Sequence, residues 1–139
     1  MKYFIEEECT RSDTAKAKGI DNTPSAEHKA HIKESIETLI DPLREVWELH
    51  CKAVGGSSTS AHCHGYAFDF VPVNGKMMEF KRFCRNFLAD KAFDQLISEG
   101  EDKLGVPAWM HVGYKHPDGV RQRRQYLSMI DGKYYPMTK

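Results

Sequence analysis

The chain has 139 residues, the length of one ordinary domain, and can bury a sizeable core without a disulfide scaffold. Its 20 basic and 20 acidic side chains give a formal net charge of zero, which argues against nucleic-acid-binding and membrane-surface proteins. No apolar run approaches the ~20 residues of a membrane-spanning helix, and Glu6 to Glu8 make the N-terminus acidic before a signal-peptide core could form. We therefore expect a single soluble domain over residues 1–139, made in the cytoplasm.

Two amphipathic helices are predicted. The first begins at Thr23-Pro24, an N-cap followed by proline at the first helical position, and extends to Trp47. Asp41-Pro42 should either kink this helix or restart it with Asp41 as a new cap. The second helix follows Asn74-Gly75. The two buried faces are marked by apolar residues at helical spacing: Ile32, Ile36, Leu39, Ile40 and Leu43 in the first helix, and Met77, Phe80, Phe83, Cys84, Phe87 and Leu88 in the second.

Several short strands are predicted between and after these helices. Tyr66 to Val73 alternates and is rich in aromatic and β-branched residues, which is typical of a strand. Phe93 to Ser98 and Ala108 to Tyr114 have similar character. Asp131-Gly132 lies between two further apolar segments and predicts a tight hairpin. Because most strands follow one another without intervening helices, we expect an α+β fold with a mainly antiparallel sheet packed against the N-terminal and middle helices.

The residues best suited to share a metal ion are His62 and Asp69. On an unbroken strand, these two would lie about 23 Å apart and point to opposite faces. Ligands of one zinc ion lie within a few Å of one another, at ~2.0–2.2 Å from the metal. A shared metal therefore requires a break in the strand, and Gly65 can supply it without a steric penalty.

A third ligand is available at His111, in the aromatic segment from Trp109 to Tyr114. Two histidines and one carboxylate leave a fourth position for water, which is the arrangement of catalytic zinc sites. The spacing leaves an alternative open. The sequence contains 7 histidines, so such pairs also arise by chance, and His62 or His64 would then only satisfy hydrogen bonds in a loop.

The sequence resembles a family of zinc peptidases that cut bonds next to D-amino acids in peptidoglycan. The family includes D-alanyl-D-alanine carboxypeptidases and the L-alanyl-D-glutamate endopeptidases of phage lysins, and Hedgehog signalling domains share its zinc fold. The resemblance extends to Lys52–Ser57 and Phe93–Ile97, and is closest to the small, phage-type branch. Its most specific element is the pattern Ser60-x-His62-x-x-Gly65-x-Ala67-x-Asp69, followed by Trp109-x-His111.

The resemblance implies one zinc ion per chain, with His62, Asp69 and His111 as its ligands. It also implies that the Ser60 hydroxyl orients a ligand or the bound water. Tyr66 and Trp109 would shape the substrate cleft, with core packing as the alternative for each. The implied reaction is metal-assisted hydrolysis of an amide bond in the peptidoglycan stem peptide, by a monomer that needs neither nucleic acid nor a membrane.

The chain departs from the family where many relatives carry a carboxylate, three residues before the last histidine. This position is Ala108, which cannot transfer a proton. We therefore expect Glu99, at the end of a strand that could pair beside the His111 strand, to be the general base. The alternative is that Glu99 is a solvent-facing loop acid. Glu101 and Asp102 are weaker candidates, because they follow Gly100 in a segment expected to be a solvated loop.

A second departure lies after the first helix. Relatives usually carry a strand that ends in Ser-Gly-Tyr-Arg, whereas here Trp47 to Lys52 runs almost directly into the glycine-rich loop.

The resemblance and its two departures leave two candidate functions. The first is an endolysin-like peptidoglycan peptidase that acts on the wall after release. The second is a catalytically impaired zinc-containing domain that binds cell wall. The cluster of Arg121, Arg123 and Arg124 would form either a solvated charged face or a contact to substrate carboxylates.

Overall fold

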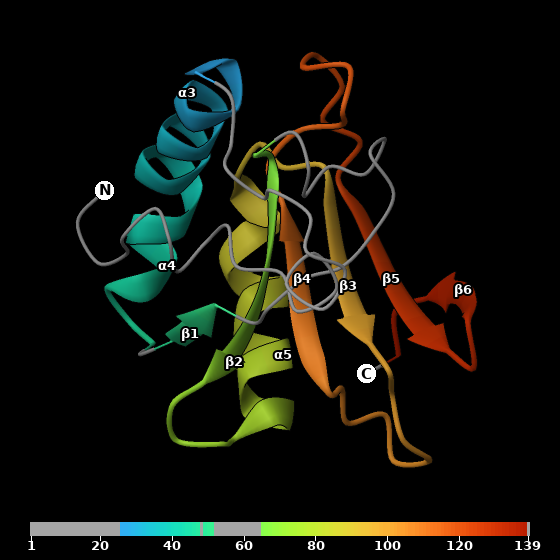
Figure 1. Ribbon diagram of the computed structural model, residues 1–139. Coiled ribbons are helices and arrows are strands. Elements are labelled where there is room, and N and C mark those ends of the chain that lie inside the picture. The colour runs from blue at the N-terminus through green and yellow to red at the C-terminus, as the bar shows by residue number, and fades with distance from the viewer. Residues whose placement is uncertain (1–25, 48, 52–64, 139) are drawn as a thin grey trace, which may run out of the picture.

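A computed structural model describes residues 26–47, 49–51 and 65–138. Its strands form one six-stranded sheet in the order β1-β2-β4-β3-β5-β6, and the helices pack against it (Figure 1). Four of the five strand pairs are antiparallel, and only β3 and β5 run parallel. The predicted α+β fold with a mainly antiparallel sheet is confirmed. None of the helices in these residues is long and apolar enough to span a membrane.

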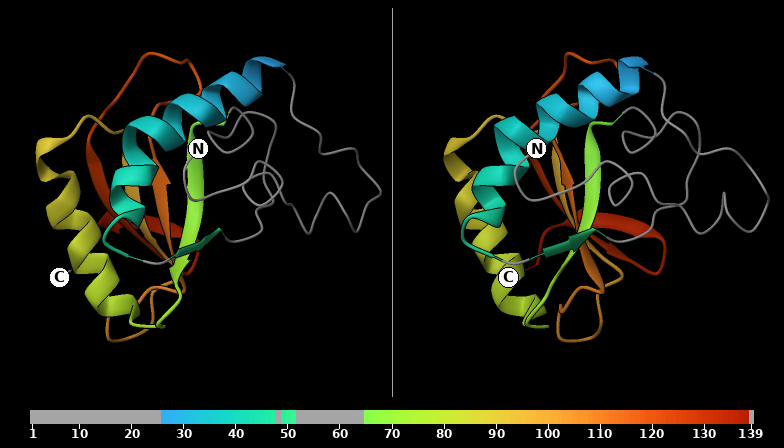
Figure 2. Two further views of the ribbon diagram at one scale, coloured as in Figure 1. Left: turned by 90° about the vertical axis from the view of Figure 1, so that its left-hand side faces the viewer. Right: turned by 60° about the vertical axis from the view of Figure 1, so that its left-hand side comes forward.

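The first helical region consists of α3 (Ala26–Ser35), a π-helical turn (Ile36–Ile40) and α4 (Asp41–Arg44). Its bend is visible in Figure 2. The change in winding comes directly before Pro42, which has no backbone N–H to continue the regular hydrogen-bond pattern. The predicted kink is therefore confirmed. Asp41 does not cap a new helix, because both it and the preceding residue keep right-handed helical dihedrals. The predicted start at Thr23-Pro24 lies outside the described residues.

The remaining elements lie close to their predicted positions. After β2, Gly75 turns the chain with a φ of 72°, and Asp131 and Gly132 join the last two strands with φ values of 50° and 76°. The paired positive φ values are those of a two-residue hairpin turn. The bounds are β2 (Ala67–Pro72), α5 (Met77–Phe87) with a 3-10 turn (Leu88–Asp90), β3 (Gln95–Glu99), β4 (Trp109–Gly113), β5 (Gln125–Ile130) and β6 (Lys133–Pro136).

One strand was not predicted. Residues Leu49–Cys51 form β1, which pairs antiparallel with the C-terminal half of β2, at residues 70–72. Its sequence contains no alternation long enough to mark a strand, so this strand depends on the neighbouring edge of β2. A short strand therefore follows the first helix after all, although the Ser-Gly-Tyr-Arg sequence of the relatives is absent.

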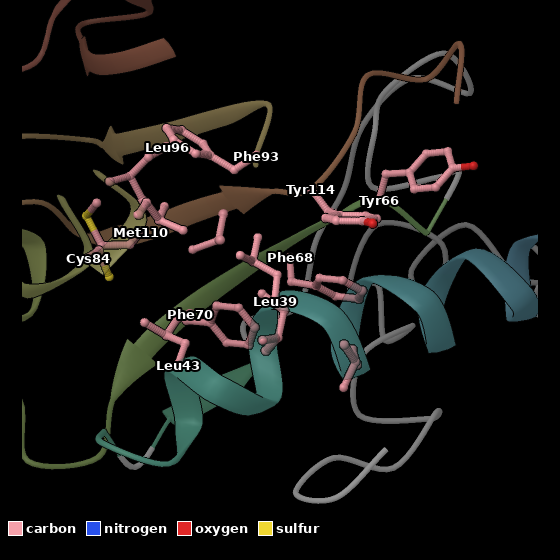
Figure 3. Packing of buried hydrophobic residues seen from close by; sticks show 14 of the residues in the cluster. Leu39, Leu43, Tyr66, Phe68, Phe70, Cys84, Phe93, Leu96, Met110 and Tyr114 are labelled. Carbon is pink, nitrogen blue, oxygen red and sulfur yellow. The ribbon is translucent and has the colours of Figure 1, made fainter. Parts of the chain in front are cut away.

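The core lies between the helices and one face of the sheet (Figure 3). The central strands contribute alternate residues to it, namely Phe68, Phe70, Leu96, Met110 and Val112. The helices contribute the apolar faces predicted for them, with Ile36, Ile40, Leu43, Phe80, Cys84 and Leu88 almost fully buried. Since successive residues of a strand point to opposite faces, this core directs the intervening residues of β2, β3 and β4 to the other face of the sheet, which we call the outer face.

Candidate metal centre

Asp69 and His111 lie directly opposite one another on the outer face. They are register partners in the antiparallel strands β2 and β4. The Nδ1 atom of His111 is 3.3 Å from Oδ1 of Asp69. Each residue is only 8% exposed, so little water competes for these two donor atoms. Two of the three predicted metal ligands, 42 positions apart in the sequence, are thus brought together by strand pairing.

The separation of these two atoms fits shared coordination of zinc. Donors at ~2.0–2.2 Å from a tetrahedral ion are about 3.3–3.6 Å apart, which is the edge of the tetrahedron. A distance of 3.3 Å is, by contrast, longer than the usual 2.7–3.2 Å of a direct N–H···O hydrogen bond. An imidazole nitrogen and a carboxylate oxygen are also donors that zinc accepts. The residues present therefore fit the metal that the sequence predicts.

Gly113 gives the His111 ring its space. A Cβ atom at Gly113 would lie 3.3 Å from Nε2 of His111 and 3.2 Å from the backbone oxygen of Gln95. Both contacts are tighter than most contacts of real Cβ atoms. Glycine at this position of β4 therefore allows the imidazole to pack against the backbone of residue 113, while its Nδ1 atom faces Asp69 of β2.

Glu99 and Trp109 extend the site along the same two strands. They are register partners of β3 and β4, and alternation places both on the face that carries His111. The predicted pairing of the Glu99 strand beside the His111 strand is confirmed. Glu99 is 8% exposed and lies within β3, so it is not a solvent-facing loop acid. Glu99 therefore belongs to the row of outer-face residues next to the row that contains Asp69 and His111.

Glu101 differs from its prediction. It was expected in a solvated loop, but its side chain is fully buried beside the similarly buried Lys81 of α5. The Lys81 ammonium donates hydrogen bonds to Glu101 (2.7 Å), to the Gly105 carbonyl (2.8 Å) and to the Thr138 hydroxyl (2.6 Å). Burial alone would raise the pKa of Glu101, but hydrogen bonds from Lys81, Ser128 and other neighbours lower it overall. Glu101 is thus committed to an ion pair and is unsuited to move protons.

The other predicted site residues divide into two groups. Tyr66 is 4% exposed and stacks on the His31 ring of α3, with ring centroids 4.3 Å apart. This position matches the core-packing alternative for Tyr66. Ser60 and His62 lie outside the described residues, as does His64.

Gly65, which follows this segment, has the conformation that the sequence required. Its φ is 77°, in the left-handed region that favours glycine. A Cβ atom there would lie 2.7 Å from the His28 carbonyl oxygen and 2.8 Å from Cγ1 of Ile32. The Ser35 hydroxyl donates a hydrogen bond to the Gly65 carbonyl at 2.9 Å. The chain therefore enters β2 through a turn held tightly against α3.

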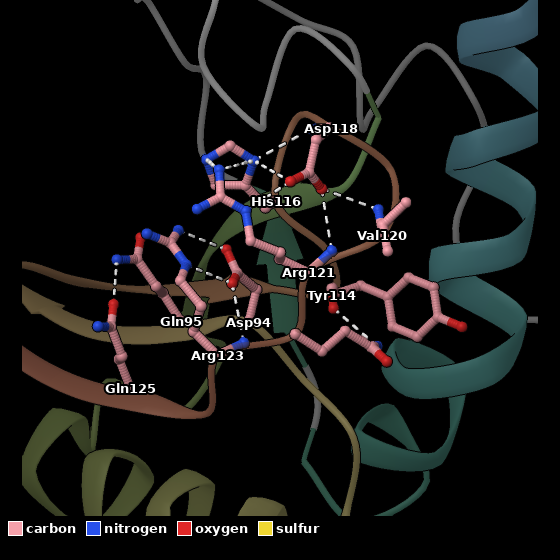
Figure 4. Close-up of polar contacts among 10 residues, drawn as sticks. Asp94, Gln95, Tyr114, His116, Asp118, Val120, Arg121, Arg123 and Gln125 are labelled. Carbon is pink, nitrogen blue, oxygen red and sulfur yellow. Dashed lines mark hydrogen bonds and ion pairs between the residues drawn. The ribbon is translucent and has the colours of Figure 1, made fainter.

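A cluster of hydrogen-bonded polar side chains, which we call the polar cluster, lies at the end of the sheet near Gly113 (Figure 4). Arg123 donates to both carboxylate oxygens of Asp94, at 2.7 and 2.8 Å, and Arg121 pairs with Asp118. The Asp94 carboxylate raises the pKa of Arg123. Two members of the predicted arginine cluster are thus neutralised by carboxylates of their own chain, which describes a solvated, ion-paired face better than a substrate contact.

One residue near the site was not predicted. Tyr134 of β6 is the register partner of Met129, which alternation places on the outer face. The hairpin turn at Asp131-Gly132 fixes this register, so counting from the turn would have placed Tyr134 on the same face as Met129.

Comparison with known proteins assigns the sequence to one family. The sequence model of the family described as Peptidase M15 matches residues 2–101, which include Asp69 and Glu99 but end before His111. Searches of curated proteins and of solved structures found no significant match. In residues 26–47, 49–51 and 65–138, no group of three or more His, Cys, Asp or Glu side chains is placed to hold a metal ion. The third predicted ligand lies outside these ranges.

Proposed function

The chain belongs to the peptidase M15 family, and we propose that it is a zinc-dependent peptidase acting on peptidoglycan. Its reaction would be hydrolysis of an amide bond next to a D-amino acid in the stem peptide, as a D-Ala-D-Ala carboxypeptidase or an L-Ala-D-Glu endopeptidase. The observation that supports this best is the 3.3 Å separation of His111 Nδ1 and Asp69 Oδ1 at a buried position. We also infer that the fold is the one shared by D-Ala-D-Ala peptidases and Hedgehog domains.

His62 would complete the ligand set with Asp69 and His111, leaving one coordination position for water or substrate. Bound zinc would polarise the scissile carbonyl and lower the pKa of a water molecule toward ~7. As zinc ligands, Asp69 would contribute a negative charge and His111 a neutral imidazole. The protein would therefore hold the ion with a net positive charge left to act on the substrate.

Glu99 would carry the proton. Its carboxylate would take a proton from the attacking water and deliver it to the amide nitrogen as the C–N bond breaks. The β3–β4 pairing supports this role, because it places Glu99 opposite Trp109 and on the face that carries His111. The family position for this group is Ala108, whose backbone N–H donates to the Glu99 carbonyl at 2.8 Å. The two positions are thus neighbours in space.

The second candidate function is a zinc-containing cell-wall-binding domain with impaired catalysis. It is favoured by the alanine at position 108 and by the absence of the Ser-Gly-Tyr-Arg sequence.

Digestion of purified peptidoglycan separates the two functions. A peptidase would clear a peptidoglycan suspension, lose this activity with a chelator, and regain it with zinc. Mass spectrometry of the released muropeptides would identify the bond that is cut. Zinc binding and sedimentation with peptidoglycan, with no new muropeptides formed, would instead support the binding domain.

A further inference from the structure

Tyr134 belongs to a row of residues that crosses four strands of the sheet. Trp109 is opposite Glu99, and Met129 is opposite Tyr134. The parallel pairing of β3 and β5 matches Ser98 with Ser128, so the next residues, Glu99 and Met129, are also neighbours. The Glu101 N–H donates to the Met129 carbonyl at 3.2 Å, which continues this ladder. The row therefore runs Trp109, Glu99, Met129, Tyr134 on the outer face.

The hairpin determines which tyrosine faces the site. A shift of one residue in the β5–β6 register would exchange Tyr134 for Tyr135. The turn resists this shift, since Asp131 and Gly132 hold φ values of 50° and 76°. Tyr135 pairs with Ser128, a fully buried residue on the core face of β5. The two adjacent tyrosines thus project to opposite sides of the sheet.

The Tyr134 phenol is on the same face of the sheet as two carboxylates of the site. Burial raises its pKa, and the negative charges of Glu99 and Asp69 raise it further. Asp69, Glu99 and Tyr134 all belong to the outer face, by the registers of β2 with β4, β3 with β4 and β5 with β6. Tyr134 is nevertheless 60% exposed, so a ligand on this face can reach it.

We propose that Tyr134 is a further catalytic residue of this site, whose hydroxyl donates a hydrogen bond to the substrate carbonyl oxygen as that oxygen acquires negative charge. This inference rests on the proposed peptidase function. Asp69 and Glu99 supply only acceptors when ionised, whereas a protonated phenol supplies a donor. When water adds to the carbonyl carbon, the new C–O bond forms and the carbonyl π electrons move to the oxygen that Tyr134 contacts. Those electrons re-form the carbonyl as the C–N bond breaks and the nitrogen takes the proton held by Glu99.

The test compares Tyr134→Phe with the control Tyr135→Phe on the zinc-loaded protein. Each substitution removes one hydroxyl and keeps the ring, and only the first hydroxyl belongs to the outer face. The first readout is hydrolysis of a stem pentapeptide. The second is calorimetric affinity for phosphinate isosteres of D-Ala-D-Ala and L-Ala-D-Glu, which mimic the tetrahedral species. Loss of one such donor lowers kcat on the order of 10²–10³-fold. We expect this for Tyr134→Phe, with little change in KM and at least tenfold weaker phosphinate binding.

Zinc content and thermal stability should remain those of the wild type in both variants, and Tyr135→Phe should match the wild type in all readouts. If the wild type hydrolyses the peptide and Tyr134→Phe does so equally fast, the role of Tyr134 is refuted and the proposed function stands. Loss of zinc from Tyr134→Phe would also refute it, since the residue would then act through the metal site. If the wild type is inactive but binds a phosphinate, weaker binding by Tyr134→Phe supports the donor role while the peptidase function fails. Absence of both activity and phosphinate binding in the wild type overturns both proposals.

Discussion

Glu99 and Glu101 are separated by a single glycine, yet their carboxylates lie on opposite sides of the sheet. Glu99 is directed to the outer face with His111, whereas Glu101 is hydrogen-bonded to Lys81 and Ser128 on the core side. The reversal takes place at Gly100, which has a φ of 61°. The turn therefore separates the proposed general base on the outer face from an acid in a buried ion pair on the core side.

The first prediction concerns the metal. The purified protein should contain about one zinc ion per chain by elemental analysis, and His62→Ala, Asp69→Ala and His111→Ala should each lower this value, because each removes a donor. His116→Ala is the control, since this histidine is hydrogen-bonded to Arg121 in the polar cluster near Gly113. Unchanged zinc content in all three ligand variants would disprove the site.

The second prediction distinguishes the two glutamates. Glu99→Gln keeps the shape of the side chain and removes its proton-accepting function, so kcat should fall by about 10²–10⁴-fold while zinc remains bound. Glu101→Gln should retain most of the wild-type kcat when assayed at a temperature at which circular dichroism shows it to be folded. The opposite pattern would make Glu101 the general base.

The third prediction concerns Gly65. A left-handed conformation costs an L-residue about 1–2 kcal/mol, and Gly65→Ala would add a clash with the backbone of α3. The matched control is Gly75→Ala, where φ is also positive (72°) but no atom lies within 4 Å of the added Cβ. Thermal unfolding should show a larger loss of stability for Gly65→Ala. Equal losses would mean that the contact with α3 contributes nothing.

The fourth prediction concerns acid stability. The pKa of Glu101 in the folded protein is lowered from its ordinary value of 4.5, so ionised Glu101 stabilises the fold above this pH. This contribution is lost as the pH falls from about 5 through the lowered pKa. The free energy of unfolding should therefore decrease more steeply with acid in the wild type than in Glu101→Gln, as measured by urea titration at several pH values. Parallel curves would contradict the assignment.

Local sequence patterns were sufficient for most of the fold. The apolar stripe of α5, the alternation of β2 and the Asp131-Gly132 turn each depend on neighbouring residues, and each lies close to its predicted position. The strand β1 was missed because three residues carry no period, and its pairing depends on β2.

The site was only partly accessible from the sequence, for the same reason. The motif and the resemblance predicted Asp69, His111 and Glu99 as site residues. Nothing local indicates that Lys81, twenty positions earlier, neutralises Glu101. Loop composition therefore gave the wrong environment for Glu101. Tyr134 was missed because its position on the outer face depends on two successive registers, β3 with β5 and β5 with β6.

The central position of β4 also determines the order in which the sheet can assemble. β2 and β3 have no hydrogen bonds to one another, because β4 lies between them and pairs with both. During synthesis β2 is made first and β3 second, and both precede residues 109–113, so neither can join the central sheet until β4 has been made. Joining β2 to β4 closes a long loop that contains α5, and such non-local pairing is intrinsically slow. Until that step, the edge of β2 that pairs with β4 is open, so the nascent chain should be most prone to aggregation just before β4 is added.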